Sequence, residues 1–288
     1  MKNFFVKSHG LGNDYIVLNQ NEIEFQLTGK AIKTICDVHY GIGSDGILLK
    51  VPSYKAAFGL RILNPDASEA EKSGNGLRIF AKYLYDLKFA KSSCFTIETP
   101  GGIVQAKIVE EQNGKAQTIK VDMGKADFNS ESVPVKCDEK ECIDVVLNLE
   151  YKDYNINCVS VGNPHCVIIK DVLDKQELLT FGPQIETNPV FPNRINVQFA
   201  RILSPTEVEV MIWERGAGYT LASGSSACAV AAVLIKKGIA EPELTVKMAG
   251  GNLKIAIDDN WNIAMTGEVR EIASGTLSRE LIAGLTRL

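Results

Sequence analysis

Two serines, Ser73 and Ser223, have the type and the setting needed for acid–base chemistry at a carbon atom. Each is followed by glycine and opens an apolar stretch that predicts a helix, over about 74–86 in the first case and about 223–239 in the second. The free N–H groups and the positive dipole end of a helix N-terminus favour an anion such as a carboxylate. A hydroxyl at such an end therefore lies beside a bound carboxylate, where it can exchange a proton with the neighbouring carbon.

The two serines belong to a repeat that covers much of the chain. They are 150 positions apart, as are the Gly-Asn pairs that end at Asn13 and Asn163. The segments 95–102 and 244–251 match at an offset of 149. Three such pairs in one order predict two similar halves. If the halves pack face to face, the serines meet across a cleft from opposite sides, which is the geometry that inversion at a carbon requires.

Short polar side chains on predicted turns form a second group of candidate site residues. They are Asn13, Asn64, Asn75, Asn163 and Asn196, together with Glu214 and Arg215. A single asparagine is an ordinary turn residue, but most of these lie on or beside the repeated motifs. The planar guanidinium of Arg215 suits a carboxylate, and the carboxylate of Glu214 suits an ammonium. Together they predict a receptor for the head group of an amino acid.

Other motifs for small-molecule chemistry are incomplete. The glycine pattern that begins at Gly216 would need a third glycine where Leu221 stands, so no dinucleotide fingerprint is present. The stretch Ser73–Gly76 lacks the Gly-Lys-Ser/Thr ending of a phosphate loop. Leu221 and Ala222 precede Ser223, which excludes the nucleophile elbow of an esterase. No lysine is marked out for a pyridoxal Schiff base.

Composition narrows the class of protein and its partners. The 288 residues carry a net charge of −4, with 45% apolar and 23% charged residues, which is typical of a globular protein and disfavours a nucleic-acid partner. Without a long apolar run or a signal peptide, we expect a cytoplasmic protein that does not associate with membranes. The seven cysteines and three histidines lack metal-binding spacing, so we expect reduced thiols and no metal. For His9 and His165 we expect a bracing role.

Predicted strands outnumber predicted helices, which favours an α+β fold over a doubly wound sheet. Besides the helices that follow the serines, helices are expected over 28–38 and about 173–180. The strands are expected over 3–8, 15–19, 47–51, 58–63, 94–99, 103–109, 117–123, 143–150, 155–161, 165–170, 193–199, 207–213, 244–248, 252–257 and 261–266. The boundaries place one domain at 1–125, completed by a C-terminal strand at about 274–288, and the other at 126–273.

The motifs together resemble the signature of the diaminopimelate epimerase family. The matching segments are His9–Asp14, Gly41–Gly46, Asn64 with Ser68–Glu71 and Gly74–Gly76, Gly162–His165, and Trp213–Gly218 with Gly224 and Ala227–Ala229. The resemblance implies a cofactor-independent enzyme, usually a homodimer, with an active site in the cleft between two pseudo-symmetric domains. Each domain would wrap mixed or antiparallel strands around a central helix.

The resemblance also implies roles for individual residues in binding a small amino-acid substrate. It places Gly74, Asn75, Gly224 and Ser225 around the α-carboxylate at the reacting centre. It places Asn13, Asn64, Asn163, Asn196, Glu214 and Arg215 around the rest of the ligand, including the distal amino-acid group. All of these residues are present in the chain.

The chain departs from the family at the centre of the chemistry, because serines 73 and 223 stand where the family has two catalytic cysteines. A helix N-terminus can lower a cysteine pKa to about 3.5–7.5, whereas a serine hydroxyl needs an adjacent base. No such base is evident in the sequence beside Ser73 or Ser223. We therefore expect interconversion of LL- and meso-diaminopimelate near neutral pH to be strongly impaired. Tyr219 also replaces a glutamate common in the family, which alters the support of the second motif.

Three explanations for the serines remain open. The chain is an engineered double Cys-to-Ser form of an epimerase, a natural relative that has become another isomerase or a dehydratase, or a binding protein without turnover. The isosteric replacement and the complete receptor favour the first, and they also fit a recent natural loss. Asn196, Glu214 and Arg215 favour diaminopimelate, which carries two amino-acid head groups, as substrate. The alternative substrate is another amino acid, with a single head group.

Overall fold

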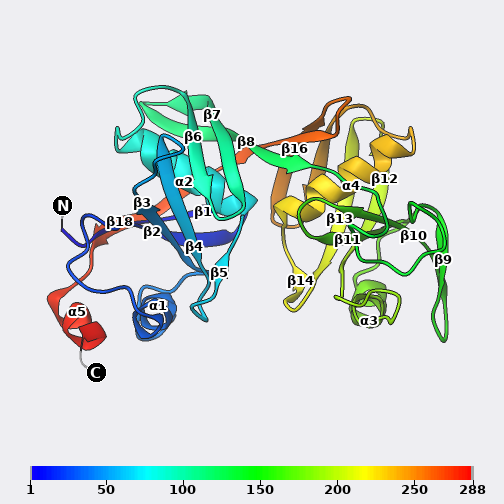
Figure 1. Cartoon of the computed structure of the whole chain (residues 1–288), viewed down its shortest axis with the longest axis horizontal. Coiled ribbons are helices and arrows are strands. Elements are labelled where there is room, and N and C mark those ends of the chain that lie inside the picture. The colour runs from blue at the N-terminus through cyan, green and yellow to red at the C-terminus, as the bar shows by residue number, and fades with distance from the viewer. Residues whose placement is uncertain (1, 287–288) are drawn as a thin grey trace. The chain divides into compact units, whose positions relative to one another are not determined.

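The computed structural model describes residues 2–286, which form two compact units. The first unit contains the residues up to Val121 and those from Gly267 onward, and the second unit runs from Asp122 to Thr266 (Figure 1). The domain boundaries expected from the repeat, at 125/126 and near 273/274, remain a prediction. No helix within 2–286 is long and apolar enough to cross a membrane.

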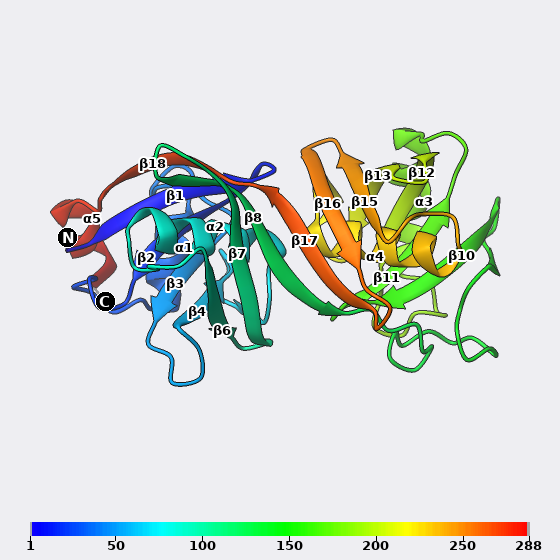
Figure 2. The ribbon, with the colours of Figure 1, turned by 90° about the horizontal axis from the view of Figure 1, so that it is seen from above.

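In the first unit, eight strands and a returning ninth follow one pairing order. They are β1 (Phe4–Gly10), β2 (Asn13–Asn19), β3 (Ile47–Val51), β4 (Phe58–Leu63), β5 (Glu69–Ala70), β6 (Cys94–Thr99), β7 (Gly102–Gln112), β8 (Lys115–Lys125) and β18 (Arg270–Thr276). β1 pairs antiparallel with β2 and with β18, which lies beside it in Figure 2. The β2–β3 and β4–β6 pairs are parallel, whereas β3–β4, β4–β5, β6–β7 and β7–β8 are antiparallel.

The second unit repeats this order pair for pair. Its strands are β9 (Val145–Asn148), β10 (Asp153–Ser160), β11 (Pro164–Ile169), β12 (Asn196–Ser204), β13 (Glu207–Glu214), β14 (Gly218–Thr220), β15 (Glu243–Met248), β16 (Gly251–Ile257) and β17 (Asn262–Glu268). Here β11–β12 and β13–β15 are the parallel pairs, in the places of β2–β3 and β4–β6. The other pairs are antiparallel. The predicted duplication and the predicted fold class are confirmed.

Each unit has one central helix against which its strands pack. α2 (Gly74–Asp86) contacts β1, β2 and β7, and α4 (Gly224–Lys236) contacts β10, β11, β12, β13, β15 and β16. α4 is apolar on nearly every side, as expected for a helix enclosed by strands. The buried basic residue Lys82 of α2 has an acidic partner, because its ammonium lies 2.9 Å from the Asp86 carboxylate. Because each central helix packs against several strands of its unit, its first turn has a fixed position relative to those strands.

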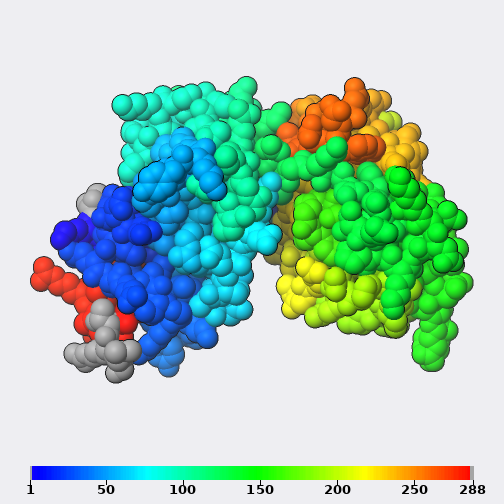
Figure 3. Space-filling model, in the orientation of Figure 1, coloured from blue at the N-terminus to red at the C-terminus, as the bar shows by residue number. Residues whose placement is uncertain are grey.

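Besides the two central helices, the described residues form three shorter helices, and one of them corrects a prediction. α1 (Gly29–Cys36) and α3 (Lys175–Glu186) match the predicted helices, although α3 is longer than expected. The C-terminal strand predicted over about 274–288 is wrong over 279–286, because α5 (Arg279–Thr286) follows β18, and its last two positions, 287–288, lie outside the described residues. The hydroxyl of Ser278 accepts the N–H of Leu281, and Leu285 packs into the core of the first unit beside α1. Figure 3 shows α5 at the surface of that unit.

Smaller differences have local causes. Gly238, with a φ of +67°, ends α4 soon after Lys236, so the expected helix end at 239 is too late. The strands β5 and β14 were not predicted from the sequence because they are only two and three residues long. Each forms a hairpin with the preceding strand and carries the chain from Asn64 or Glu214 toward the serine.

Candidate active site

Ser73 and Ser223 occupy the same backbone position in their own units. Each is the N-cap of the central helix, with φ and ψ of −141° and 119° for Ser73 and −145° and 125° for Ser223. The Ser73 hydroxyl accepts the N–H of Gly76 over 3.1 Å, and the Ser223 hydroxyl accepts that of Ser226 over 3.4 Å. Because these bonds use the oxygen as acceptor, the hydroxyl hydrogen can be donated elsewhere.

A carboxylate lies next to Ser223, contrary to the prediction that neither serine has an adjacent base. Glu214 ends β13, and its half-buried side chain accepts the hydroxyl of Thr220 over 2.9 Å. Loss of water raises the pKa of Glu214, and its hydrogen-bonding interactions with Thr220 and Ser223 oppose that rise. The result is a carboxylate with a higher than ordinary proton affinity beside the serine hydroxyl, as a general base requires.

Ser73 has a different neighbour, the phenol of Tyr15 on β2. The two oxygens are 3.5 Å apart, a long contact for a hydrogen bond. Gly46 makes room for this ring, because a Cβ on Gly46 would lie only 2.9 Å from Tyr15 Cε1. The two serines therefore share a backbone position but differ in the chemistry of the group beside them.

Polar residues of the first unit gather at the N-terminus of α2. Asn75, in the first turn, donates from Nδ2 to Asn13 Oδ1 over 3.2 Å. The turn between β4 and β5 holds Asn64, whose Nδ2 donates to the Ser68 hydroxyl over 2.9 Å. The structure thus brings Asn13, Asn75 and the backbone of Gly74 together, whereas the contacts of Asn64 are those of its own turn.

In the second unit, a buried histidine orients Asn163. His165 on β11 is fully buried, with Nε2 2.9 Å from Asn163 Oδ1 and Nδ1 3.1 Å from Gln198 Nε2. Burial, reinforced by the positive charge of Arg215, lowers the pKa of His165 to about 3, although the hydrogen bond with Gln198 opposes the shift. The imidazole is therefore neutral, and it braces Asn163 as expected for a structural histidine.

Asn196 uses its amide to hold the loop that carries Arg215. Its Oδ1 accepts the backbone N–H of Arg215 over 3.0 Å, and its Nδ2 donates to the carbonyl of Pro164 over 2.8 Å. The guanidinium of Arg215 donates to the carbonyl of Asn193 over 3.0 Å. Asn196 therefore ties the beginnings of β11 and β12 to the turn after β13, and through this turn it positions Arg215.

Glu186, at the end of α3, is a site-supporting residue that sequence reasoning missed. Its carboxylate is buried and accepts the indole N–H of Trp213 over 2.7 Å and the N–H of Gly216 over 2.8 Å. It also pairs with Arg194. The chain on both sides of Glu214 is thereby fixed to α3. In the sequence this residue is indistinguishable from a surface glutamate.

The remaining candidate residues complete the second helix terminus. Gly224 begins α4, and the Ser225 hydroxyl lies 3.5 Å from that of Ser223. Tyr219 on β14 has the ammonium of Lys175 on α3 4.1 Å from its ring centre. The contact is a cation–π interaction, so an attachment between β14 and α3 exists without a carboxylate.

Metal ligands do not gather among the described residues: no group of three or more His, Cys, Asp or Glu there could hold an ion. The seven cysteines are free thiols, five of them buried. The neighbouring Cys158 thiol and burial raise the pKa of Cys142. The contact with Cys142 lowers the pKa of Cys158, but the Cys166 thiol and burial outweigh it and raise that pKa. These thiols belong to the core of the second unit and have no thiolate character.

Comparison with known proteins gives a consistent family assignment. The diaminopimelate epimerase family model matches residues 5–129 and 157–272. The chain is 48% identical over 280 residues to diaminopimelate epimerase 2 of Nostoc sp., covering 97% of both chains. It is 40% identical to diaminopimelate epimerase of Acetivibrio thermocellus, covering 94% of this chain and 97% of the relative.

Solved structures share the fold at low sequence identity. A hydroxyproline epimerase from Agrobacterium vitis superposes with a TM-score of 0.71 at 13% identity, covering 95% of this chain and 90% of that one. A phenazine biosynthesis protein from Bacillus anthracis superposes with a TM-score of 0.64 at 15% identity, covering 96% and 100%. The two-unit architecture therefore recurs in proteins whose sequences have diverged widely.

Proposed function

The chain belongs to the diaminopimelate epimerase family, a family of isomerases, and on this premise we propose that it binds diaminopimelate and transfers a proton at its α-carbon. Ser73 would act on one face of that carbon and Ser223 on the other, without a cofactor. The observation that carries the proposal is the matched N-cap position of the two serines at the central helices of repeated units. No other pair of hydroxyls in the described repeat has this placement.

Recognition of the substrate follows from the groups at the helix termini. The N–H groups near Gly74 and Gly224 bind the α-carboxylate, with Asn75 and Ser225 beside them. The rest of the ligand is held by the polar side chains of Asn13, Asn64, Asn163, Asn196, Glu214 and Arg215. Positive helix ends at the carboxylate also stabilise the negative charge that develops when the α-proton leaves.

The reaction consists of two coupled proton transfers, one on each face of the α-carbon. On one face Ser223 removes the α-proton while its own hydroxyl proton passes to Glu214, so the carbon–hydrogen bond breaks and its electron pair moves into the carboxylate carbon–oxygen system. On the other face Ser73 donates its hydroxyl proton to the carbon, and the electron pair returns from the carboxylate to form the new carbon–hydrogen bond. Ser73 then takes a proton from the Tyr15 phenol, which solvent reprotonates, and Glu214 releases its proton to solvent. A serine is a weaker acid than a cysteine, so turnover by this route is slow even with Glu214 present.

A second candidate function is proton abstraction from a more acidic carbon, as in another isomerase or a dehydratase. The observation that favours it is the raised pKa of Glu214, because a carboxylate of increased basicity can act without a thiolate. The discriminating test is a panel of amino and hydroxy acids assayed for loss of an α-proton or of water. A product other than the inverted amino acid would establish this alternative.

Family membership also supports proposals about the oligomeric state and the cellular location of the protein. We propose a homodimer and a cytoplasmic location. Light scattering should then give twice the chain mass of 31.4 kDa. A mass of one chain at micromolar concentration would contradict the dimer.

Titration calorimetry tests the substrate directly, because binding does not require turnover. LL-diaminopimelate should bind the parent protein, and Arg215→Ala should weaken binding by roughly tenfold or more, since a guanidinium–carboxylate pair is lost. If an amino acid with a single head group binds and diaminopimelate does not, the substrate assignment is wrong.

A further inference from the structure

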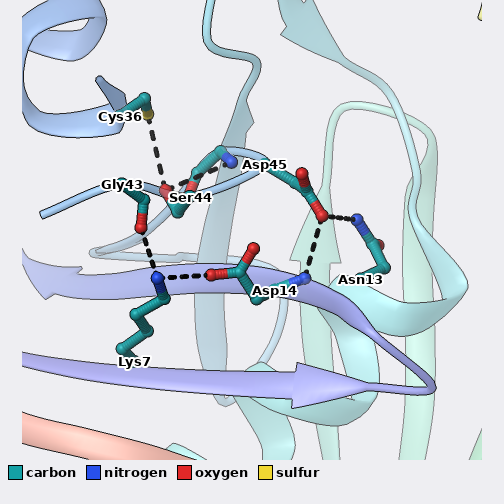
Figure 4. Close-up of polar contacts among 8 residues, drawn as sticks. Lys7, Asn13, Asp14, Cys36, Gly43, Ser44 and Asp45 are labelled. Carbon is teal, nitrogen blue, oxygen red and sulfur yellow. Dashed lines mark hydrogen bonds and ion pairs between the residues drawn. The ribbon is translucent and has the colours of Figure 1, made fainter. Parts of the chain in front are cut away.

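The turn Gly41–Gly46 is one of the family motifs, but its residues are not among the candidate site residues. It is fixed to the start of β2 by a reciprocal pair of bonds, of which Figure 4 draws the one from the Asp14 N–H to the Asp45 carboxylate. The N–H of Asp45 donates to the carbonyl of Asp14 over 3.0 Å, and the N–H of Asp14 donates to Asp45 Oδ2 over 3.0 Å. Lys7 secures the same turn, donating to the Gly43 carbonyl over 2.5 Å and pairing with the Asp14 carboxylate over 2.8 Å.

The carboxylate of Asp45 also holds the side chain of Asn13. Asn13 Nδ2 donates to Asp45 Oδ2 over 2.8 Å, as Figure 4 shows. Beyond Asn13, the Nδ2 of Asn75 donates to Asn13 Oδ1, and Arg78 donates to Asn75 Oδ1 over 2.7 Å. Four side chains therefore form one row of hydrogen bonds from α2 to the turn.

The polarity of this row is fixed at both ends. A guanidinium can only donate hydrogen bonds, and an ionised carboxylate can only accept them. Arg78 therefore turns the oxygen of Asn75 toward itself, and Asp45 turns the nitrogen of Asn13 toward itself. Reversing the Asn13 amide would place its oxygen against the Asp45 carboxylate and its nitrogen against the nitrogen of Asn75. Both contacts would be repulsive.

We infer that Asp45 is a positioning residue that fixes Asn13 as a hydrogen-bond donor to a carboxylate of the ligand. The inference rests on the proposed function, which places Asn13 at the substrate. An amide nitrogen carries two hydrogens. One of those on Asn13 is committed to Asp45, and its oxygen is already engaged by Asn75. The remaining N–H suits a carboxylate oxygen and discriminates against an ammonium at that place.

Three variants test this role by calorimetry with LL-diaminopimelate. Asp45→Ala frees the Asn13 amide and should weaken binding by roughly tenfold, since an oriented donor to a charged group is lost. Asp45→Asn should bind like the parent, because an amide oxygen can accept both bonds that Asp45 Oδ2 accepts. Asp37→Ala is the matched control, since Asp37 accepts the N–H groups of His39 and Tyr40 and contacts no candidate ligand residue.

Melting temperatures separate positioning from general stability. Asp45 is exposed, so Asp45→Ala should melt within about 4 °C of the parent, as should Asp37→Ala. Unchanged affinity in Asp45→Ala overturns the inference, as does an equal loss of affinity in Asp37→Ala. A loss in Asp45→Asn equal to that in Asp45→Ala also overturns it, because the ligand then pairs directly with the charge of Asp45. If the parent does not bind diaminopimelate, it is the proposed function that fails.

Discussion

The half-buried carboxylate of Glu214 interacts with the hydroxyl of Ser223, the residue that caps α4. The two residues are nine positions apart in the sequence, and the β13–β14 hairpin between them turns the chain back toward the helix. This pairing gives the serine on one side of the proposed reaction a base.

The Glu214→Gln variant should lose most of the α-proton exchange activity. Removing the carboxylate while keeping its shape should slow exchange of the substrate α-proton by about 10²–10⁴-fold, which is the usual contribution of a general base. Deuterium incorporation measured by NMR gives the rate. Glu207→Gln, at the start of the same strand, is the control and should exchange like the parent. Equal rates in Glu214→Gln and Glu207→Gln would remove Glu214 from the mechanism.

The same substitution should raise the stability of the folded protein at neutral pH, although it lowers activity. Because the pKa of Glu214 is raised in the folded state, the folded protein holds this proton at pH values where the unfolded chain has lost it. Stability therefore falls as pH rises through that window, which begins at the ordinary value for glutamate. Glu214→Gln should melt higher than the parent at pH 7, with a smaller difference at pH 4. A lower melting temperature at pH 7 would contradict the desolvation argument.

Tyr15→Phe tests the group beside the other serine. The variant keeps the ring packed against Gly46 and removes only the hydroxyl that lies 3.5 Å from Ser73. We expect α-proton exchange to fall by roughly tenfold, with unchanged ligand affinity, because one hydrogen-bonding partner of the serine is lost. Tyr83→Phe, a buried tyrosine of α2, is the control. If both variants exchange alike, Tyr15 has no part in proton transfer.

The neutral His165 predicts a specific loss of stability in acid. Its folded pKa of about 3 lies below the unfolded value of about 6.5, so the unfolded state takes up the proton first as pH falls. The free energy of unfolding should then drop by about 2 kcal/mol between pH 7 and pH 5. Urea titrations of His165→Gln should lack this drop, whereas His39→Gln should keep it. The same slope in all three proteins would show that His165 is not the source.

Glu186→Ala tests the support of the loop behind Glu214. The substitution leaves the indole of Trp213 and the N–H of Gly216 without their acceptor, so the protein should lose about 3 kcal/mol of stability. Gln184→Ala, on an exposed face of the same helix, should change stability by less than about 0.5 kcal/mol. Urea unfolding measures both. A loss in Glu186→Ala no larger than that in Gln184→Ala would show that the loop is held by other contacts.

Regular elements were predictable because they depend on local patterns. The strands at 47–51, 58–63 and 94–99 and the helix α2 begin and end where the apolar spacing predicted. The repeat also predicted the equivalence of Ser73 and Ser223, because duplicated motifs carry duplicated backbone geometry.

Contacts across the fold were not predictable in the same way. Glu186 looks like a surface residue because its partners are 27 and 30 positions away in the sequence. Asp45 is part of a recognised motif, but its bond to Asn13 depends on how β2 and β3 lie together. α5 was missed because the segment after β18 was expected to continue as a strand.

The central claim is that the chain carries an epimerase scaffold in which serines occupy the two proton-transfer positions. Its most direct test is incubation with LL-diaminopimelate in D₂O, following the α-proton by NMR, for the parent and for Ser73→Cys/Ser223→Cys. We expect rapid exchange and inversion in the cysteine form and exchange at least about 10²-fold slower in the parent, because a thiolate ionises near neutral pH and a hydroxyl does not. Equal rates in the two proteins, or no exchange in either, would contradict the claim.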